Sequence, residues 1–296
     1  MGAGHSHDHS HVADFGRTFA IGIALNLAFV IVEAVYGLLA GSMALLADAG
    51  HNLSDVLGLV LAWAGAALVK RRPNHRFSYG LKKSSILAAL LNALLLLVAV
   101  GAIIAESVRR LSNPQPTDGE VVIAVATVGI LVNGITAWLF ARGRKHDINI
   151  RGAFLHMGAD AAVSAAVVVA GLAILMTGQQ WIDPVMSLIV AAVILWSSFG
   201  LLKESVWMSL AGVPSGISLD AVEVELAAID GVDEVHDLHV WPLSTTETAL
   251  TAHVVAPKVK STDSLLRQIR SMVHDRFGID HSTIQVEREN QRDADC

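Results

Sequence analysis

Two short segments of the sequence carry metal-binding side chains at a helical spacing. They are His51–Asp55, which reads His-Asn-Leu-Ser-Asp, and His156–Asp160, which reads His-Met-Gly-Ala-Asp. Residues four apart lie one turn apart on the same side of a helix, so each segment presents an imidazole and a carboxylate together. Both segments lie in long apolar stretches, where an Asp near the bilayer centre costs about 2.5–3.5 kcal/mol on insertion scales. Two such helices facing each other would form a four-ligand metal site, which explains the presence of these aspartates.

The donor set favours zinc. Two imidazole nitrogens and two carboxylate oxygens in a tetrahedron suit Zn²⁺, with Cd²⁺ and Co²⁺ as alternatives. Mg²⁺ and Ca²⁺ prefer an all-oxygen shell. All four ligands also bind protons, and histidine titrates near pH 6.5, so a site that releases metal into an acidic compartment returns loaded with H⁺. The sequence has no Walker A motif, so we expect no ATP drive and predict proton antiport by alternating access.

Other acidic residues lie within the apolar stretches. Asp48 is three residues before His51 and shares its helix face. We expect Asp48 nearer the outer mouth, behind the ligands or on the path of the ion. For Glu33 and Glu106 we favour a structural role, with proton movement as the alternative.

Composition predicts a polytopic α-helical membrane protein. Of the 296 residues, 53 % are hydrophobic and only 16 % are charged, with a mean hydropathy of +0.53, whereas soluble domains have about 25 % charged residues. The single cysteine, Cys296, excludes an intrachain disulfide, and the net charge of −6 does not indicate a nucleic-acid partner. Six apolar stretches approach the roughly 20 residues that a bilayer requires, and together they define a six-helix transmembrane domain at 17–210. They are Arg17–Ala40, Leu46–Lys70, Ser84–Arg109, Glu120–Arg142, Ala153–Thr177 and Pro184–Met208.

The charges of the loops predict how the helices are oriented in the membrane. The loops after the second and fourth stretches carry ten Lys and Arg residues, whereas the opposite ends carry Arg109 and Arg110. By the positive-inside rule both termini are cytoplasmic. Residues 1–16 form a tail in which alternating histidines, His5, His7, His9 and His11, are interpreted as a metal-collecting arm. The alternative is a disordered tail or a tagging artefact.

Residues 211–290 have the composition of a separate polar domain. Helical spacing at Leu219–Ile229 and Ser264–Phe277, and strand-like patterns at Val232–Leu243, Thr248–Ala256 and Ser282–Val286, predict the order α-β-β-α-β. We predict a small open-faced, ferredoxin-like α+β domain of the metallochaperone kind, followed by a frayed tail at 291–296.

These features resemble the cation diffusion facilitator family over nearly the whole chain. Ala44–Asp55 looks like the family's second-helix signature, His236–Trp241 like the first strand of its cytoplasmic domain, and Thr283–Glu287 like its last strand. The similarity is greatest to bacterial cobalt–zinc–cadmium resistance exporters and zinc transporters. It implies a homodimer in the bacterial inner membrane that exports zinc for protons through His51, Asp55, His156 and Asp160. In this family a mixed His and Asp set is associated with zinc preference.

The resemblance also implies a regulatory zinc site in the cytoplasmic domain. Relatives use a His of the first strand, a His of the second and a carboxylate of the third, where this chain has His236, His253 and Glu287. His281 shares a strand face with Glu287 and can join them. Ideal alternation places His236 and His239 on opposite faces, so they are not expected to serve one ion. The alternative is a set of surface histidines at an interface.

The loop between the second and third stretches is not expected to bind metal. Some relatives have an Asp and two histidines there, and this loop supplies only His75.

Two other functions use the same residues. One is a membrane-embedded zinc metalloenzyme, but catalytic zinc keeps an open position and this set fills all four, so we predict that the protein is not an enzyme. The other is a metal-sensing membrane protein, which would need an output from the C-terminal domain.

Overall fold

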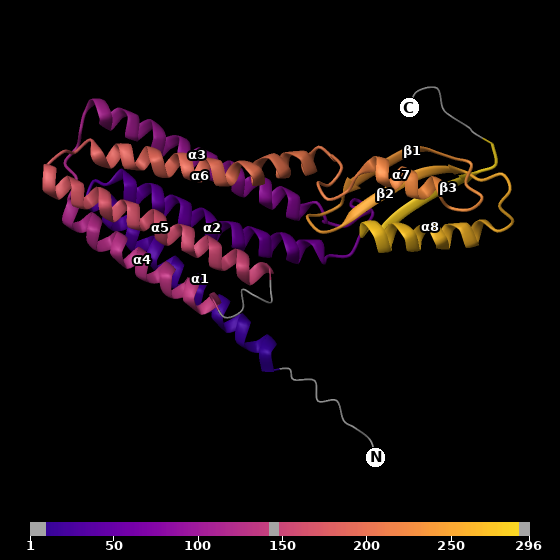
Figure 1. Cartoon of the computed structure of the whole chain (residues 1–296), viewed down its shortest axis with the longest axis horizontal. Coiled ribbons are helices and arrows are strands. Elements are labelled where there is room, and N and C mark those ends of the chain that lie inside the picture. The colour runs from indigo at the N-terminus through magenta and orange to yellow at the C-terminus, as the bar shows by residue number, and fades with distance from the viewer. Residues whose placement is uncertain (1–9, 142–147, 290–296) are drawn as a thin grey trace, which may run out of the picture. The chain divides into compact units, whose positions relative to one another are not determined.

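The computed structural model describes residues 10–141 and 148–289, which form long helices followed by a small α+β domain (Figure 1). This confirms the predicted fold class. The long helices are α1 (Ser10–Leu39), α2 (Met43–Val69), α3 (Ser84–Ser112), α4 (Gly119–Ala141), α5 (Ile148–Thr177) and α6 (Ile182–Ser209). Helix α1 begins seven residues before the predicted start at Arg17.

Five of these helices, α2 to α6, are long and apolar enough to cross a membrane within the described residues, and the corresponding apolar part of α1 is the shorter Ala24–Leu39. Large apolar side chains face outward, such as Trp196, which is 88 % exposed. Such a surface suits lipid and would be a liability in water. Helix α4 packs along α5 and α1 along α4. A Cβ atom at Gly171 would lie 2.8 Å from Ile123 Cγ1, so α4 and α5 approach closely through a small residue.

A buried carboxylate holds the start of α2. Asp183, near the start of α6, accepts hydrogen bonds from Ser42 Oγ (2.5 Å), the Met43 N–H (2.6 Å) and the Ala44 N–H (3.3 Å). The first N–H groups of a helix have no partner within it, and the helix dipole favours a negative charge at that end. Asp183 therefore caps α2 and ties it to α6.

The C-terminal domain contains a three-stranded sheet in the order β1-β2-β3, with β1 and β2 antiparallel and β2 and β3 parallel. Two helices and the sheet share an apolar core that includes Leu226, Leu250 and Ile269. Helix α8 buries Leu265, Ile269 and Val273 at intervals of four residues, the spacing of one helix face. The predicted element order is observed as α7 (Leu219–Ala227), β1 (Glu234–Pro242), β2 (Thr248–Val255), α8 (Thr262–Phe277) and β3 (His281–Glu287).

The loop between α2 and α3 belongs to the same compact unit as the C-terminal domain. Lys82 forms an ion pair with Glu247 of the β1–β2 turn. The ring of Tyr79 meets that of His281 edge-on, with centroids 5.2 Å apart. The loop that joins α2 to α3 thus contacts the C-terminal domain through side chains.

Candidate metal sites

Helices α2 and α5 bring the two His-x-x-x-Asp segments face to face. His156 Nε2 lies 3.1 Å from Asp55 Oδ2, and His51 Nε2 lies 3.5 Å from Asp160 Oδ1. Each histidine therefore contacts the aspartate of the other helix. Within its own helix, each histidine is 3.7 Å from the aspartate four residues on, so both aspartates have both histidines as neighbours.

This cluster can hold a metal ion. One ligand atom each from Asp55, His156 and Asp160 lies within 4.8 Å of the others. His51 lies beside this group of three, and its ring meets that of His156 edge-on with centroids 5.9 Å apart. Asp160 is only 2 % exposed. Within the described chain, Asp160 Oδ2 has no hydrogen-bond partner, and a bound cation would satisfy this buried oxygen.

Asp48 and Glu33 lie beside the cluster rather than in it. Asp48 accepts a hydrogen bond from Ser164 Oγ at 3.1 Å, and Glu33 accepts one from Asn52 Nδ2 at 3.3 Å. Both carboxyl groups are almost fully buried. Asp48 thus connects α2 to α5, one helical turn before His51. Glu106, by contrast, is held in ion pairs with Arg109 and Arg110.

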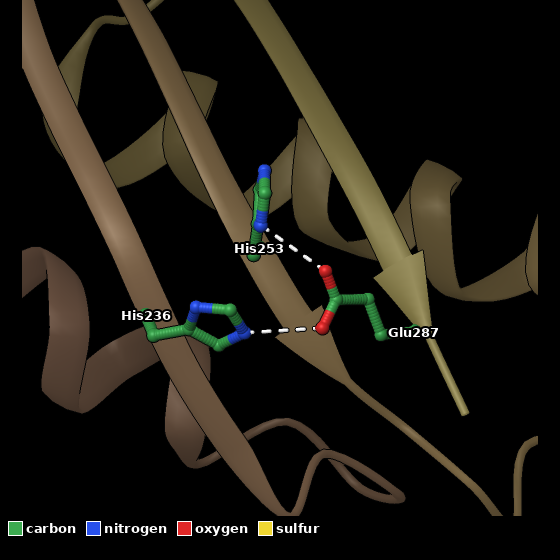
Figure 2. Close-up of side chains that lie close together, drawn as sticks. All are labelled: His236, His253 and Glu287. Carbon is green, nitrogen blue, oxygen red and sulfur yellow. Dashed lines mark hydrogen bonds and ion pairs between the residues drawn. The ribbon is translucent and has the colours of Figure 1, made fainter. Parts of the chain in front are cut away.

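The C-terminal domain holds a second cluster, with one residue from each strand (Figure 2). His236 Nε2 on β1 lies 3.1 Å from Glu287 Oε2 on β3, and His253 Nδ1 on β2 lies 3.1 Å from Glu287 Oε1. The two rings are edge-on with centroids 5.1 Å apart. Two imidazoles around one carboxylate form a donor set that fits Zn²⁺.

A β-bulge changes which residues face this cluster. His236 pairs with His253, but His239 pairs with Thr251, so three steps along β1 match two along β2. The extra residue returns His239 to the face of His236. The prediction that these two histidines point to opposite faces is therefore wrong, because it assumed an unbroken alternation.

Asp237, at the bulge, is a residue that sequence reasoning missed. Its Oδ1 lies 2.7 Å from His239 Nε2 and its Oδ2 lies 3.5 Å from His253 Nε2. The hydrogen bond with His239 lowers the pKa of the Asp237 carboxyl below its ordinary value, and the nearby imidazoles act in the same direction. The segment His-Asp-Leu-His carries no local signal of a bulge, so nothing in the sequence alone places Asp237 beside His239 and His253.

The other predicted ligands do not join either cluster. His281 pairs in register with Ala249 and is four residues from Gln285, about 13 Å along the strand, and it contacts Tyr79 instead. His75 is exposed in its loop and belongs to no metal-binding group among the described residues. His5, His7, His9 and the side chain of His11 lie outside the described residues.

Comparison with known proteins gives matches over nearly the whole chain. The family model of the cation efflux transmembrane domain matches residues 19–208, and that of the cation efflux protein cytoplasmic domain matches residues 214–289. The chain is 35 % identical to the metal cation efflux system protein CzcD of Cupriavidus metallidurans, covering 100 % of this chain and 93 % of that protein. It is 35 % identical to the zinc transporter ZitB of Escherichia coli, covering 100 % and 96 %. It is 33 % identical to the cadmium, cobalt and zinc/H⁺-K⁺ antiporter of Bacillus subtilis, covering 96 % and 92 %.

Proposed function

Since this chain belongs to the cation efflux, or cation diffusion facilitator, family of metal transporters, we propose that it exports Zn²⁺ in exchange for protons. That it is a membrane-spanning metal cation efflux transporter follows from the family. We propose three further points: that the transported ion is Zn²⁺, that protons move in exchange, and which residues bind the metal. The observation that carries it is the pairing of each histidine on α2 and α5 with the aspartate of the other helix.

The chemistry of the four side chains supports Zn²⁺ as the transported ion and H⁺ as the ion exchanged for it. His51, Asp55, His156 and Asp160 supply two nitrogens and two carboxylates, and the carboxylates neutralise the dication in a low-dielectric region. Protons compete with metal for all four groups, so acid on the outer side displaces the metal and loads the empty site with H⁺. The ZitB relative is named a zinc transporter and the B. subtilis relative an antiporter that uses protons. This exchange needs no ATP.

The orientation and assembly are part of the proposal. The basic residues of the α2–α3 and α4–α5 loops support cytoplasmic termini in a bacterial inner membrane. The match to the family's cytoplasmic domain supports a homodimer formed through residues 211–290. We assign His236, His253 and Glu287 to a regulatory Zn²⁺ site, which would draw two domains together and bias the attached helices.

The rival functions lack comparable support. The family and the relatives are transporters rather than enzymes. A metal sensor would need an effector surface, and the match of residues 214–289 is to a domain of the exporters themselves.

Zinc flux in proteoliposomes tests the proposal. With an acidic lumen, the protein should take up Zn²⁺ into the vesicle while a trapped pH dye reports loss of lumenal protons. Asp55→Ala and Asp160→Ala should abolish both signals.

Glu120→Ala, which removes an exposed carboxylate at the start of α4, is the matched control and should transport normally. Unchanged flux in both site variants overturns the ligand assignment, and flux indifferent to the pH gradient overturns proton exchange.

A further inference from the structure

We propose that Asp237 positions His253 in the C-terminal metal site, so that the ring binds metal through Nδ1 while Nε2–H donates to the Asp237 carboxylate. This inference rests on the regulatory site proposed above. It adds a residue to that site and states which ring nitrogen serves as ligand.

The His253 ring lies between two carboxylates. Its Nδ1 is 3.1 Å from Glu287 Oε1, and its Nε2 is 3.5 Å from Asp237 Oδ2. Figure 2 shows one ring nitrogen facing Glu287 and the other pointing away from it. A neutral imidazole has one N–H and one lone pair, and a metal ion takes the lone pair. The nitrogen beside Glu287 and His236 is therefore the ligand, and the nitrogen beside Asp237 carries the proton.

A carboxylate behind a metal-binding histidine is a general device. The ligand histidine usually donates its second N–H to such a group, which fixes the tautomer and the ring orientation and raises the basicity of the ligand nitrogen. The distance of 3.5 Å exceeds an ordinary N–H···O hydrogen bond by a few tenths of an ångström, so the proposal includes a slight approach of the His253 ring to Asp237 when metal is bound.

One hydrogen bond and the local backbone conformation hold the Asp237 carboxylate in place. Its other oxygen, Oδ1, accepts a hydrogen bond from His239 Nε2 at 2.7 Å, so the carboxylate links two imidazoles. The bulge carries the carboxylate to this face of the sheet, because Asp237 adopts a φ of +49°. That region is unfavourable for most L-residues and is visited chiefly by Gly, Asn and Asp. A backbone held there beside a metal-binding cluster indicates a functional constraint.

Because Asp237 has a positive φ, substitutions at this position can separate the loss of the carboxylate from a loss of stability. Asp237→Gly deletes the carboxylate and relaxes the backbone, while Asp237→Asn tolerates the same φ and keeps an oxygen that accepts from His253. Asp233→Ala, at an exposed position four residues earlier, is the matched control. All variants are made in the full chain with Asp160→Asn, so that the helix site does not contribute to the titration.

The measurements are Zn²⁺ affinity, by competition with a chelating dye, and the thermal midpoint of the metal-free protein. We expect Asp237→Gly to lower affinity about 10- to 100-fold while its metal-free midpoint stays equal or rises. Asp237→Asn should retain most of the affinity, and Asp233→Ala all of it. In ¹⁵N-histidine-labelled protein, the zinc-bound form should show a protonated Nε2 and a metal-bound Nδ1 for His253.

Two different failures can be told apart. If His253→Ala and Glu287→Ala bind Zn²⁺ with wild-type affinity, the regulatory site itself is refuted. If those variants lose the site but Asp237→Gly binds as tightly as the parent, or Asp237→Asn is as weak as Asp237→Gly, the role of Asp237 is overturned and the regulatory site stands.

Discussion

His156 Nε2 lies 3.1 Å from Asp55 Oδ2, although 101 positions separate the two residues. Together with the contact between His51 and Asp160, this makes the cluster a crossed arrangement in which neither helix completes a site alone. A metal ion bound here would therefore be held by α2 and α5 jointly. A displacement of one helix against the other would change the distances between the residues of α2 and those of α5.

Replacing a nitrogen donor should change metal preference. His51→Asp makes the set one imidazole and three carboxylates, which suits oxygen-preferring ions such as Mn²⁺ better than the native set does. We expect the ratio of Zn²⁺ to Mn²⁺ uptake to fall about tenfold, equivalent to about 1.4 kcal/mol. Uptake of both ions by proteoliposomes measures it, with His75→Ala as the exposed histidine control. An unchanged ratio would show that His51 is not a ligand.

The cap on α2 should matter for stability. Asp183→Ala leaves the Ser42 hydroxyl and the Met43 N–H buried without their acceptor, at about 1–3 kcal/mol per group. The thermal midpoint in detergent should fall clearly. Asp118→Ala removes an exposed cap at the start of α4 and should cost less, about 0.5–2 kcal/mol. Equal midpoints for the two variants would contradict the buried-cap interpretation.

The ion pair between Lys82 and Glu247 should survive when the two charges are swapped between the two positions. Lys82→Glu and Glu247→Lys each place like charges together, and the double variant restores attraction. Because both side chains are partly exposed, the coupling should be only about 0.2–1 kcal/mol. Hydrogen exchange of residues 70–83 should speed up in each single variant and recover in the double variant. Lys83→Glu, at the exposed neighbour, should leave exchange unchanged, and a double variant as fast as the singles would refute the pairing.

Truncating a buried side chain of β2 should destabilise the C-terminal domain. Leu250 is 0 % exposed, so Leu250→Ala opens a cavity and should lower the free energy of unfolding of the domain by about 2–5 kcal/mol. Val224→Ala on α7, where the side chain is 66 % exposed, should change it by less than about 0.5 kcal/mol. Urea unfolding followed by tryptophan fluorescence checks both values. A small effect at Leu250 would contradict its place in the core.

The secondary structure was largely predictable because its causes are local. Hydropathy marked the membrane helices, with α1 extending further toward the N-terminus than expected. The order of elements in the C-terminal domain followed from periodicity. His281 shows the limit of this reasoning. It shares a strand face with Glu287, as alternation predicts, yet in-register pairing places it opposite Ala249, far from the cluster.

By itself, the sequence determined which side chains are able to bind metal and on which helix or strand each lies, because side-chain type and period are properties of a short segment. Only the tertiary structure decided which of them meet. The crossing of His51 with Asp160 depends on how α2 and α5 pack, and the approach of Asp237 to His253 depends on a bulge that exists only when β1 pairs with β2. Distances between residues remote in sequence are set by helix packing and strand pairing, and the bulge that shifts the pairing of β1 has no local signal in the sequence.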